Sequence, residues 1–125
     1  MFDNIKYEQN GEMMTGHVKV EIWVEEGALH YSKENGYGNE PIQDAVSDVS
    51  VEEFSKQMEA LKIEGWKKSY TPVGVLVMDG STWSVRYETE DDKPVKVSGE
   101  NAYPVNWKKF IKTLKTVVGD FDDFD

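Results

Sequence analysis

The chain contains no cysteine, and only two histidines and four prolines occur among its 125 residues. The absence of cysteine excludes disulfide frameworks, cysteine-based zinc sites and thiol nucleophiles. It also fits a reducing compartment, so we expect a cytoplasmic protein. The longest apolar run, residues 73–78, is far shorter than a membrane helix, and the first residues lack the pattern of a signal peptide. We therefore expect no membrane partner.

Basic residues are also scarce, with 14 Lys and Arg against 24 Asp and Glu and a net charge of −10. Binding to a phosphate backbone requires Lys and Arg that displace counterions, so we expect no direct nucleic-acid binding. The acidic balance is compatible with a basic protein partner, or with solubility alone. Residues 120–125 hold four of the acids and are predicted to form a disordered acidic tail.

Turn and period signals predict a first segment of strands followed by a helix. After an Asn-Gly turn signal at 10–11, apolar residues alternate along 17–25, which is typical of a half-buried strand. A two-residue turn at 26–27 leads to a second strand that carries Leu29 and Tyr31. Ser50 and Glu53 form a capping box, and the helix that follows has this apolar stripe: Val51, Phe54, Met58 and Leu61.

A second segment follows the same plan. Residues 73–78 are predicted to form a strand, an Asp-Gly turn follows at 79–80, and alternating residues in 83–88 and 95–97 predict two further strands. A helix then begins near 104–106 and ends at Gly119. Its predicted inward residues are Trp107, Phe110, Ile111, Leu114, Val117 and Val118.

The two segments also match in sequence, because residues 32–37 correspond to 98–103 at an offset of 66. We therefore predict an α+β fold with two pseudo-repeated βββα halves, at about 1–65 and 66–119. The halves form a single domain, residues 1–119, because each alone is too small to bury its apolar face. The simplest arrangement is one or two antiparallel sheets with both helices on one side.

Few residues offer catalytic or metal-binding chemistry. His30 is expected opposite Trp23 on the polar face. His17 lies six residues before Trp23 on the same strand, so it is roughly 20 Å away from this pair. The two histidines therefore cannot share one metal ion, and we expect neither a metal site nor a cofactor. There is no Ser-His-acid set and no Gly-rich phosphate loop, so we expect a protein that is not an enzyme.

Candidate binding residues fall into two groups. The first is Trp23 with His30, because an exposed tryptophan can anchor a protein partner; Trp66 is a similar candidate, whereas Trp83 and Trp107 are expected in the core. The second is the repeated loop, whose two copies can form related rims of a pocket between the halves: Glu34, Asn35 and Tyr37, and Glu100, Asn101 and Tyr103. In the alternative interpretation these asparagines shape turns and the tyrosines cover the core.

Residues 79–110 contain a DG-x-x-W strand followed by G-x-N-A-Y-P and a helix. This pattern resembles a signature found in a family of small bacterial and phage proteins that has no assigned activity. The resemblance implies a hairpin that leads into a helix and a bacterial or phage origin. It implies no catalytic residues.

These observations favour a non-enzymatic protein-interaction module. One alternative is an inhibitor of a basic nucleic-acid enzyme, of the immunity or DNA-mimic type. Another, from a different class, is a small-ligand-binding domain that uses the cleft between the halves.

Overall fold

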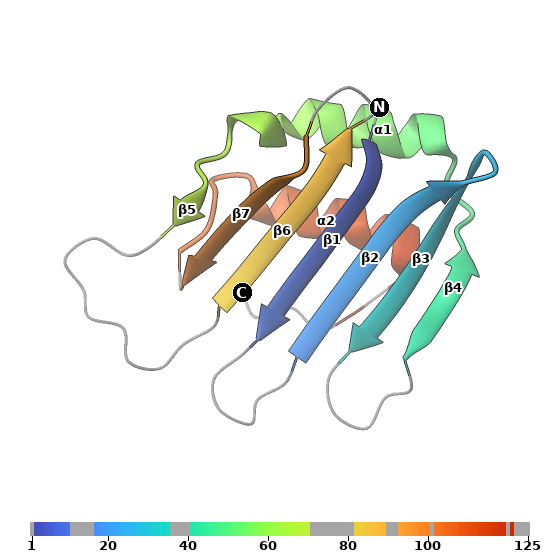
Figure 1. Cartoon of the computed structure of the whole chain (residues 1–125), viewed down its shortest axis with the longest axis horizontal. Helices are drawn as coiled ribbons and strands as arrows, with labels where there is room; N and C mark the ends of the chain where they lie inside the picture. Colours follow the sequence, from blue (N-terminus) through green and yellow to red (C-terminus); the bar gives the residue numbers. More distant parts are fainter. Residues whose placement is uncertain are drawn as a thin grey trace.

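The computed structural model describes residues 2–10, 17–35, 41–70, 82–89, 93–100, 102–119 and 121. In this part of the chain, seven strands form one mixed sheet in the order β4-β3-β2-β1-β6-β7-β5. Two α-helices lie side by side behind the sheet and leave its other face uncovered (Figure 1). The predicted α+β fold, with both helices on one side, is therefore confirmed.

The central strand β1 (Phe2–Asn10) pairs antiparallel with both β2 (His17–Glu25) and β6 (Thr82–Thr89). The pairing between β1 and β6 joins the early and late parts of the chain. The other strands are β3 (Ala28–Asn35), β4 (Ile42–Val46), β5 (Ser69–Tyr70) and β7 (Val95–Glu100). The sheet is mixed because β5 pairs with β7 in parallel. The prediction of a wholly antiparallel sheet was wrong on this point.

Both predicted helices are present. Helix α1 (Val51–Leu61) begins at Ser50, whose Oγ accepts a hydrogen bond of 3.1 Å from the Glu53 backbone N–H. A single turn of 3₁₀ helix, η1 (Ile63–Gly65), follows it. Helix α2 (Trp107–Val118) ends at Gly119, where φ is 83°. The capping box and the C-terminal glycine therefore act as predicted.

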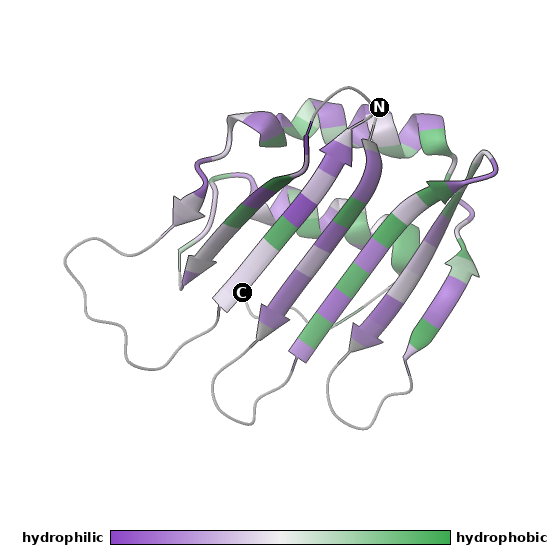
Figure 2. Cartoon of the chain, in the orientation of Figure 1, coloured by the Kyte–Doolittle hydropathy of each residue, from purple (hydrophilic) through white to green (hydrophobic). Residues whose placement is uncertain are grey.

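The core lies between the helices and one face of the sheet. Figure 2 shows strands that alternate between hydrophobic and hydrophilic residues, as expected when only one face is buried. The centre is aromatic: the rings of Trp83 and Trp107 lie 4.4 Å apart, and Trp66 and Tyr103 pack against them. All six predicted inward residues of α2 are buried.

One polar side chain, Gln9, is buried inside this core. Tyr7 donates its hydroxyl hydrogen to Gln9 Oε1, and Gln9 Nε2 donates to the Tyr103 hydroxyl at 3.1 Å. Both ends of the amide therefore have partners, which removes the penalty of an unsatisfied buried polar group. This network ties β1 to the segment that precedes α2.

The structure does not confirm the pseudo-repeat. Four strands precede α1, whereas three described strands separate the helices. The β2–β3 and β6–β7 hairpins lie on opposite sides of β1, like mirror images. If a rotation about β1 related the two hairpins, the helices that follow them would lie on opposite faces of the sheet. Both helices lie on the same face. The predicted strand at 73–78 lies outside the described residues, and β4 and β5 were not predicted.

The predicted disordered tail also needs correction at its start. Phe121 is buried, its ring lies 6.0 Å from that of Tyr7, and the Lys115 ammonium lies 5.2 Å from its centre. The chain therefore still contributes to the core after Gly119. Residues 120 and 122–125 lie outside the described part.

Within the described residues, the helices have eleven and twelve residues, and none is long and apolar enough to cross a membrane.

Gly99 is expected to be required for the packing of Trp83. A Cβ atom at this position would lie 2.6 Å from Trp83 Nε1. We expect Gly99→Ala to lower the free energy of unfolding, measured in urea, by about 1–3 kcal/mol, because the large ring must shift. Gly65→Ala is the control, since a Cβ there meets no atom within 4 Å, and we expect a change below about 0.5 kcal/mol. Equal stability of the two variants would contradict this role of Gly99.

Candidate functional site

The uncovered face of the sheet carries a row of residues that are direct cross-strand neighbours. Glu88, Asn4, Trp23, His30 and Val46 come from β6, β1, β2, β3 and β4 in that order. Trp23 is half-buried and Val46 is 62% exposed. The row therefore brings two apolar side chains to a face whose other residues are mostly charged.

A tight turn fixes the middle of this row. Glu26 and Gly27 have φ values of 51° and 78°, the left-handed conformation that a two-residue hairpin turn of type I′ requires. The register that follows sets Trp23 opposite His30, as the sequence predicted. Their rings are stacked at an angle of 25°, with centroids 6.0 Å apart.

An irregularity in β4 brings a third strand into the site. The register between β3 and β4 shifts so that Gln43 and Asp44 together oppose Ser32, which is the geometry of a β-bulge. Asp44 has a φ of 50°, and its backbone N–H donates to Ser32 Oγ at 3.3 Å. Aspartate tolerates this left-handed conformation better than most residues.

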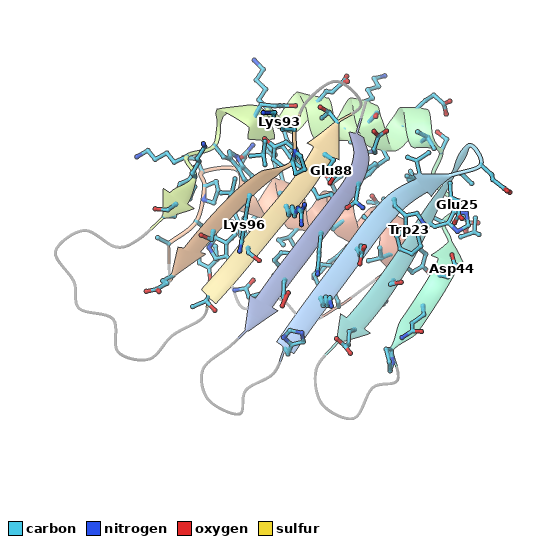
Figure 3. The ribbon with its side chains drawn as sticks, viewed as in Figure 1. Trp23, Glu25, Asp44, Glu88, Lys93 and Lys96 are labelled. Carbon is cyan, nitrogen blue, oxygen red and sulfur yellow. The ribbon has the colours of Figure 1, made fainter. Side chains whose placement is uncertain are left out.

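The turn and the bulge together surround His30 with carboxylates. Asp44 Oδ1 lies 2.8 Å from His30 Nδ1, and Glu25 Oε2 lies 3.6 Å from the same nitrogen. The Trp23 indole N–H donates to Glu25 Oε2 at 3.3 Å. Figure 3 shows Trp23, Glu25 and Asp44 gathered near the β2–β3 turn, on the face away from the helices.

This cluster differs from the sequence prediction, which treated His30 as an exposed strand histidine. Its side chain is only 17% exposed. The expected absence of a metal site rested on the distance between the two histidines and took no account of Glu25 and Asp44. The turn at 26–27 could have indicated that Glu25 lies near His30, because a two-residue turn brings residue 25 close to the strand that carries His30. Nothing in the sequence pattern indicated the bulge at Asp44.

A shallow depression of about 470 Å³ borders Trp23. Its charged lining is wholly acidic and consists of Asp3, Glu21 and Glu88. The next row of the face contains three basic residues, because Lys6, Arg86 and Lys96 are direct neighbours across β1, β6 and β7. Lys6 in turn lies opposite Glu21 of β2, which lines the depression. The Arg86 guanidinium approaches Glu88 at 3.8 Å. The face is therefore acidic around Trp23 and basic beside it.

The described residues of the two repeated loops do not form one pocket. Glu34 and Glu100 lie on β3 and β7, four strand spacings or about 19 Å apart. Tyr103 is half-buried and packs against Trp83 and Trp107, which fits the alternative in which it covers the core. Among the described residues, the predicted pair of rims is therefore not found. The side chain of Asn35, and all of Tyr37 and Asn101, lie outside the described residues.

The predicted cleft between the halves is also not found among the described residues, because β1 pairs directly with β6 there. Trp66 is not an exposed anchor: its ring centre lies 5.2 Å from that of Phe110, and its N–H donates to Asn106 at 2.8 Å. A hollow of about 490 Å³ beside Trp66 also includes Lys68 and Lys93 in its lining. It opens at the β5 side of the sheet, away from Trp23.

The backbone of the bulge can be tested by two substitutions that both remove the Asp44 carboxylate. We expect Asp44→Val to lower the free energy of unfolding by about 1–2 kcal/mol, because a β-branched residue is strained in the left-handed conformation. Asp44→Asn should change it by less than about 0.5 kcal/mol, since asparagine accommodates this geometry. Urea denaturation measures both. An equal loss in the two variants would assign the effect to the carboxylate and not to the backbone.

Comparisons of this chain with models of known protein families and with curated proteins find no match. The resemblance of residues 79–110 to a bacterial and phage signature therefore stays a prediction. The arguments for a function rest on the uncovered face of the sheet.

Proposed function

We propose that this chain is a non-enzymatic protein-interaction module that binds a basic segment of a partner protein around Trp23. The observation that carries the proposal is a half-buried tryptophan beside a depression whose charged residues are all carboxylates, on a sheet face that no helix covers. Tryptophan is enriched among the residues that contribute most to protein–protein binding, so a partly exposed ring can serve as an anchor for a partner.

The chemistry of this depression suits arginine or lysine in the partner. A cationic side chain can lie over the Trp23 ring and gain a cation–π interaction. The same group can form charge-assisted hydrogen bonds with Glu21 or Glu88, which line the depression. Val46 lies two strands from Trp23 and can contact an apolar residue of the same segment.

The basic row beside the depression supports a protein partner over a mimic of DNA. Lys6, Arg86 and Lys96 are direct cross-strand neighbours. Carboxylates of the same face lie beside them, because Glu21 is opposite Lys6 and Glu88 approaches Arg86 at 3.8 Å. The three basic charges interrupt the carboxylates, so this face does not resemble a continuous phosphate backbone. A partner segment with basic residues followed by acidic ones would match both rows and would bind in one orientation.

The inhibitor alternative is retained without DNA mimicry. In this form the basic partner is a nucleic-acid enzyme that the chain binds as a protein. We also propose a cytoplasmic location, on the grounds drawn from the sequence. No observation favours the small-ligand alternative at the junction of the halves, where β1 and β6 are paired.

The proposal can be tested with random peptides displayed on phage and selected on the purified protein. We expect enrichment of peptides rich in arginine and lysine, whose binding weakens as salt is added. In NMR titrations with a selected peptide, the shifted resonances should cluster on Trp23, Glu21 and Glu88. Trp23→Ala should weaken binding by about 2 kcal/mol or more, because a central tryptophan is a typical hot spot.

Val105→Ala is the matched control, since Val105 is a fully exposed apolar residue just before α2 and away from this face. It should leave the affinity unchanged. Selected peptides without basic residues, or shifts confined to another face, would refute the proposal.

A further inference from the structure

The cluster around His30 combines side chains from three strands. Glu25 ends β2, His30 lies within β3 and Asp44 lies within the bulge of β4. In the described part of the chain, these form the one group of three metal-ligating side chains whose ligand atoms all lie within 4.8 Å of one another. Segments separated in sequence have thus been brought to a single point.

The arrangement places two carboxylates beside a single imidazole nitrogen. Two carboxylate oxygens approach the same ring nitrogen, His30 Nδ1, at 2.8 and 3.6 Å. That nitrogen holds one proton at most and can donate it to only one acceptor at a time. Asp44 is at hydrogen-bonding distance, so Glu25 Oε2 receives its hydrogen bond from Trp23 and none from His30. A divalent cation between the three atoms would interact with all of them.

The distances agree with such a cation. Zinc binds imidazole nitrogen and carboxylate oxygen at about 2.0–2.1 Å, so two ligand atoms of a tetrahedral site lie about 3.3 Å apart. Two of the three separations, 2.8 and 3.6 Å, lie on either side of this value, and the third, between the two carboxylates, is within 4.8 Å. Glu25 and Asp44 are exposed by 55% and 69%, which leaves both side chains free to adjust by small rotations.

Neighbouring groups already orient the three ligands. The Trp23 ring stacks on His30, and its indole N–H donates to Glu25 Oε2, the same oxygen that approaches His30. The Asp44 backbone is held by Ser32 Oγ. Metal sites depend on such outer contacts because they fix the direction of each ligand atom. Trp23 is therefore a positioning residue for this cluster.

We propose that Glu25, His30 and Asp44 bind a first-row divalent cation such as Zn²⁺. One imidazole and two carboxylates suit zinc and its neighbours, whereas Mg²⁺ and Ca²⁺ prefer ligand sets made of oxygen alone. The exposed side of the cluster leaves room for a water molecule in the fourth position. A bound cation would also link edge strand β4 to the β2–β3 hairpin.

The test is a titration of the purified, metal-free protein with zinc, followed by calorimetry. We expect one zinc ion per chain and no comparable binding of magnesium. His30→Ala should weaken zinc binding by about tenfold or more, and Asp44→Asn and Glu25→Gln should each weaken it as well. The melting temperature should rise with zinc in the wild type but not in His30→Ala, since a ligand of the folded state stabilises it.

His17→Ala is the matched control. His17 also lies near a carboxylate, at 3.8 Å from Glu34, but it belongs to no group of three ligands among the described residues. This variant should bind zinc like the wild type. It also leaves His30 as the only histidine, so a zinc-induced shift of the imidazole nitrogen signals can be assigned to His30 without ambiguity.

Zinc binding that persists unchanged in His30→Ala or Asp44→Asn would overturn the proposal, and so would the absence of saturable binding to the wild type. The titration uses this chain alone, so its failure leaves the peptide selection of the proposed function intact. Conversely, zinc binding without any selected peptide would support the metal site and refute the docking surface.

Discussion

Both helices pack against the same face of the sheet. This constraint determines which kinds of residue the other face carries. The apolar side chains of the strands point toward α1 and α2, where the aromatic rings around Trp83 and Trp107 fill the centre of the core. The opposite face has no helix to cover it (Figure 1), and the cross-strand neighbours on it are mainly charged and polar residues. On such a face Trp23 and Val46 are exceptions, and the proposed docking surface is built on them.

The central position of β1 makes this arrangement possible. It pairs with β2 on one side and β6 on the other, so residues from both ends of the sequence meet across a continuous sheet. The acidic depression therefore contains Asp3, Glu21 and Glu88, which are far apart along the chain. Neither the depression nor the basic row would exist if the two segments formed separate sheets.

Two short stretches of left-handed backbone aim the side chains around His30. The turn at 26–27 sets the register of the hairpin, and the bulge at Asp44 directs a carboxylate toward the same imidazole. Trp23 contacts this cluster through its indole N–H and also borders the acidic depression. The proposed docking surface and the proposed cation site are thus adjacent, and they share one residue.

Local patterns in the sequence were sufficient to predict several of these features. The alternation in residues 17–25 and the tight turn predicted that Trp23 and His30 face each other, because register in a hairpin depends on the turn. The capping box and the apolar stripes predicted both helices. The similar Ser-to-Tyr loops suggested a repeat that the structure does not confirm. The first copy includes a strand end that faces solvent, whereas the second includes a segment that packs on the core.

By itself, then, the sequence determined which segments form α1, α2 and the β2–β3 hairpin, because these structures depend on neighbours in the chain. Only the tertiary structure decided the rest. The exposed edge strand β4 has little apolar pattern, and its bulge arises from its pairing with β3. The contact of Asp44 with His30, the β1–β6 pairing and the mirror-like order of the hairpins all result from hydrogen bonds between distant segments, which leave no periodic signal in the sequence.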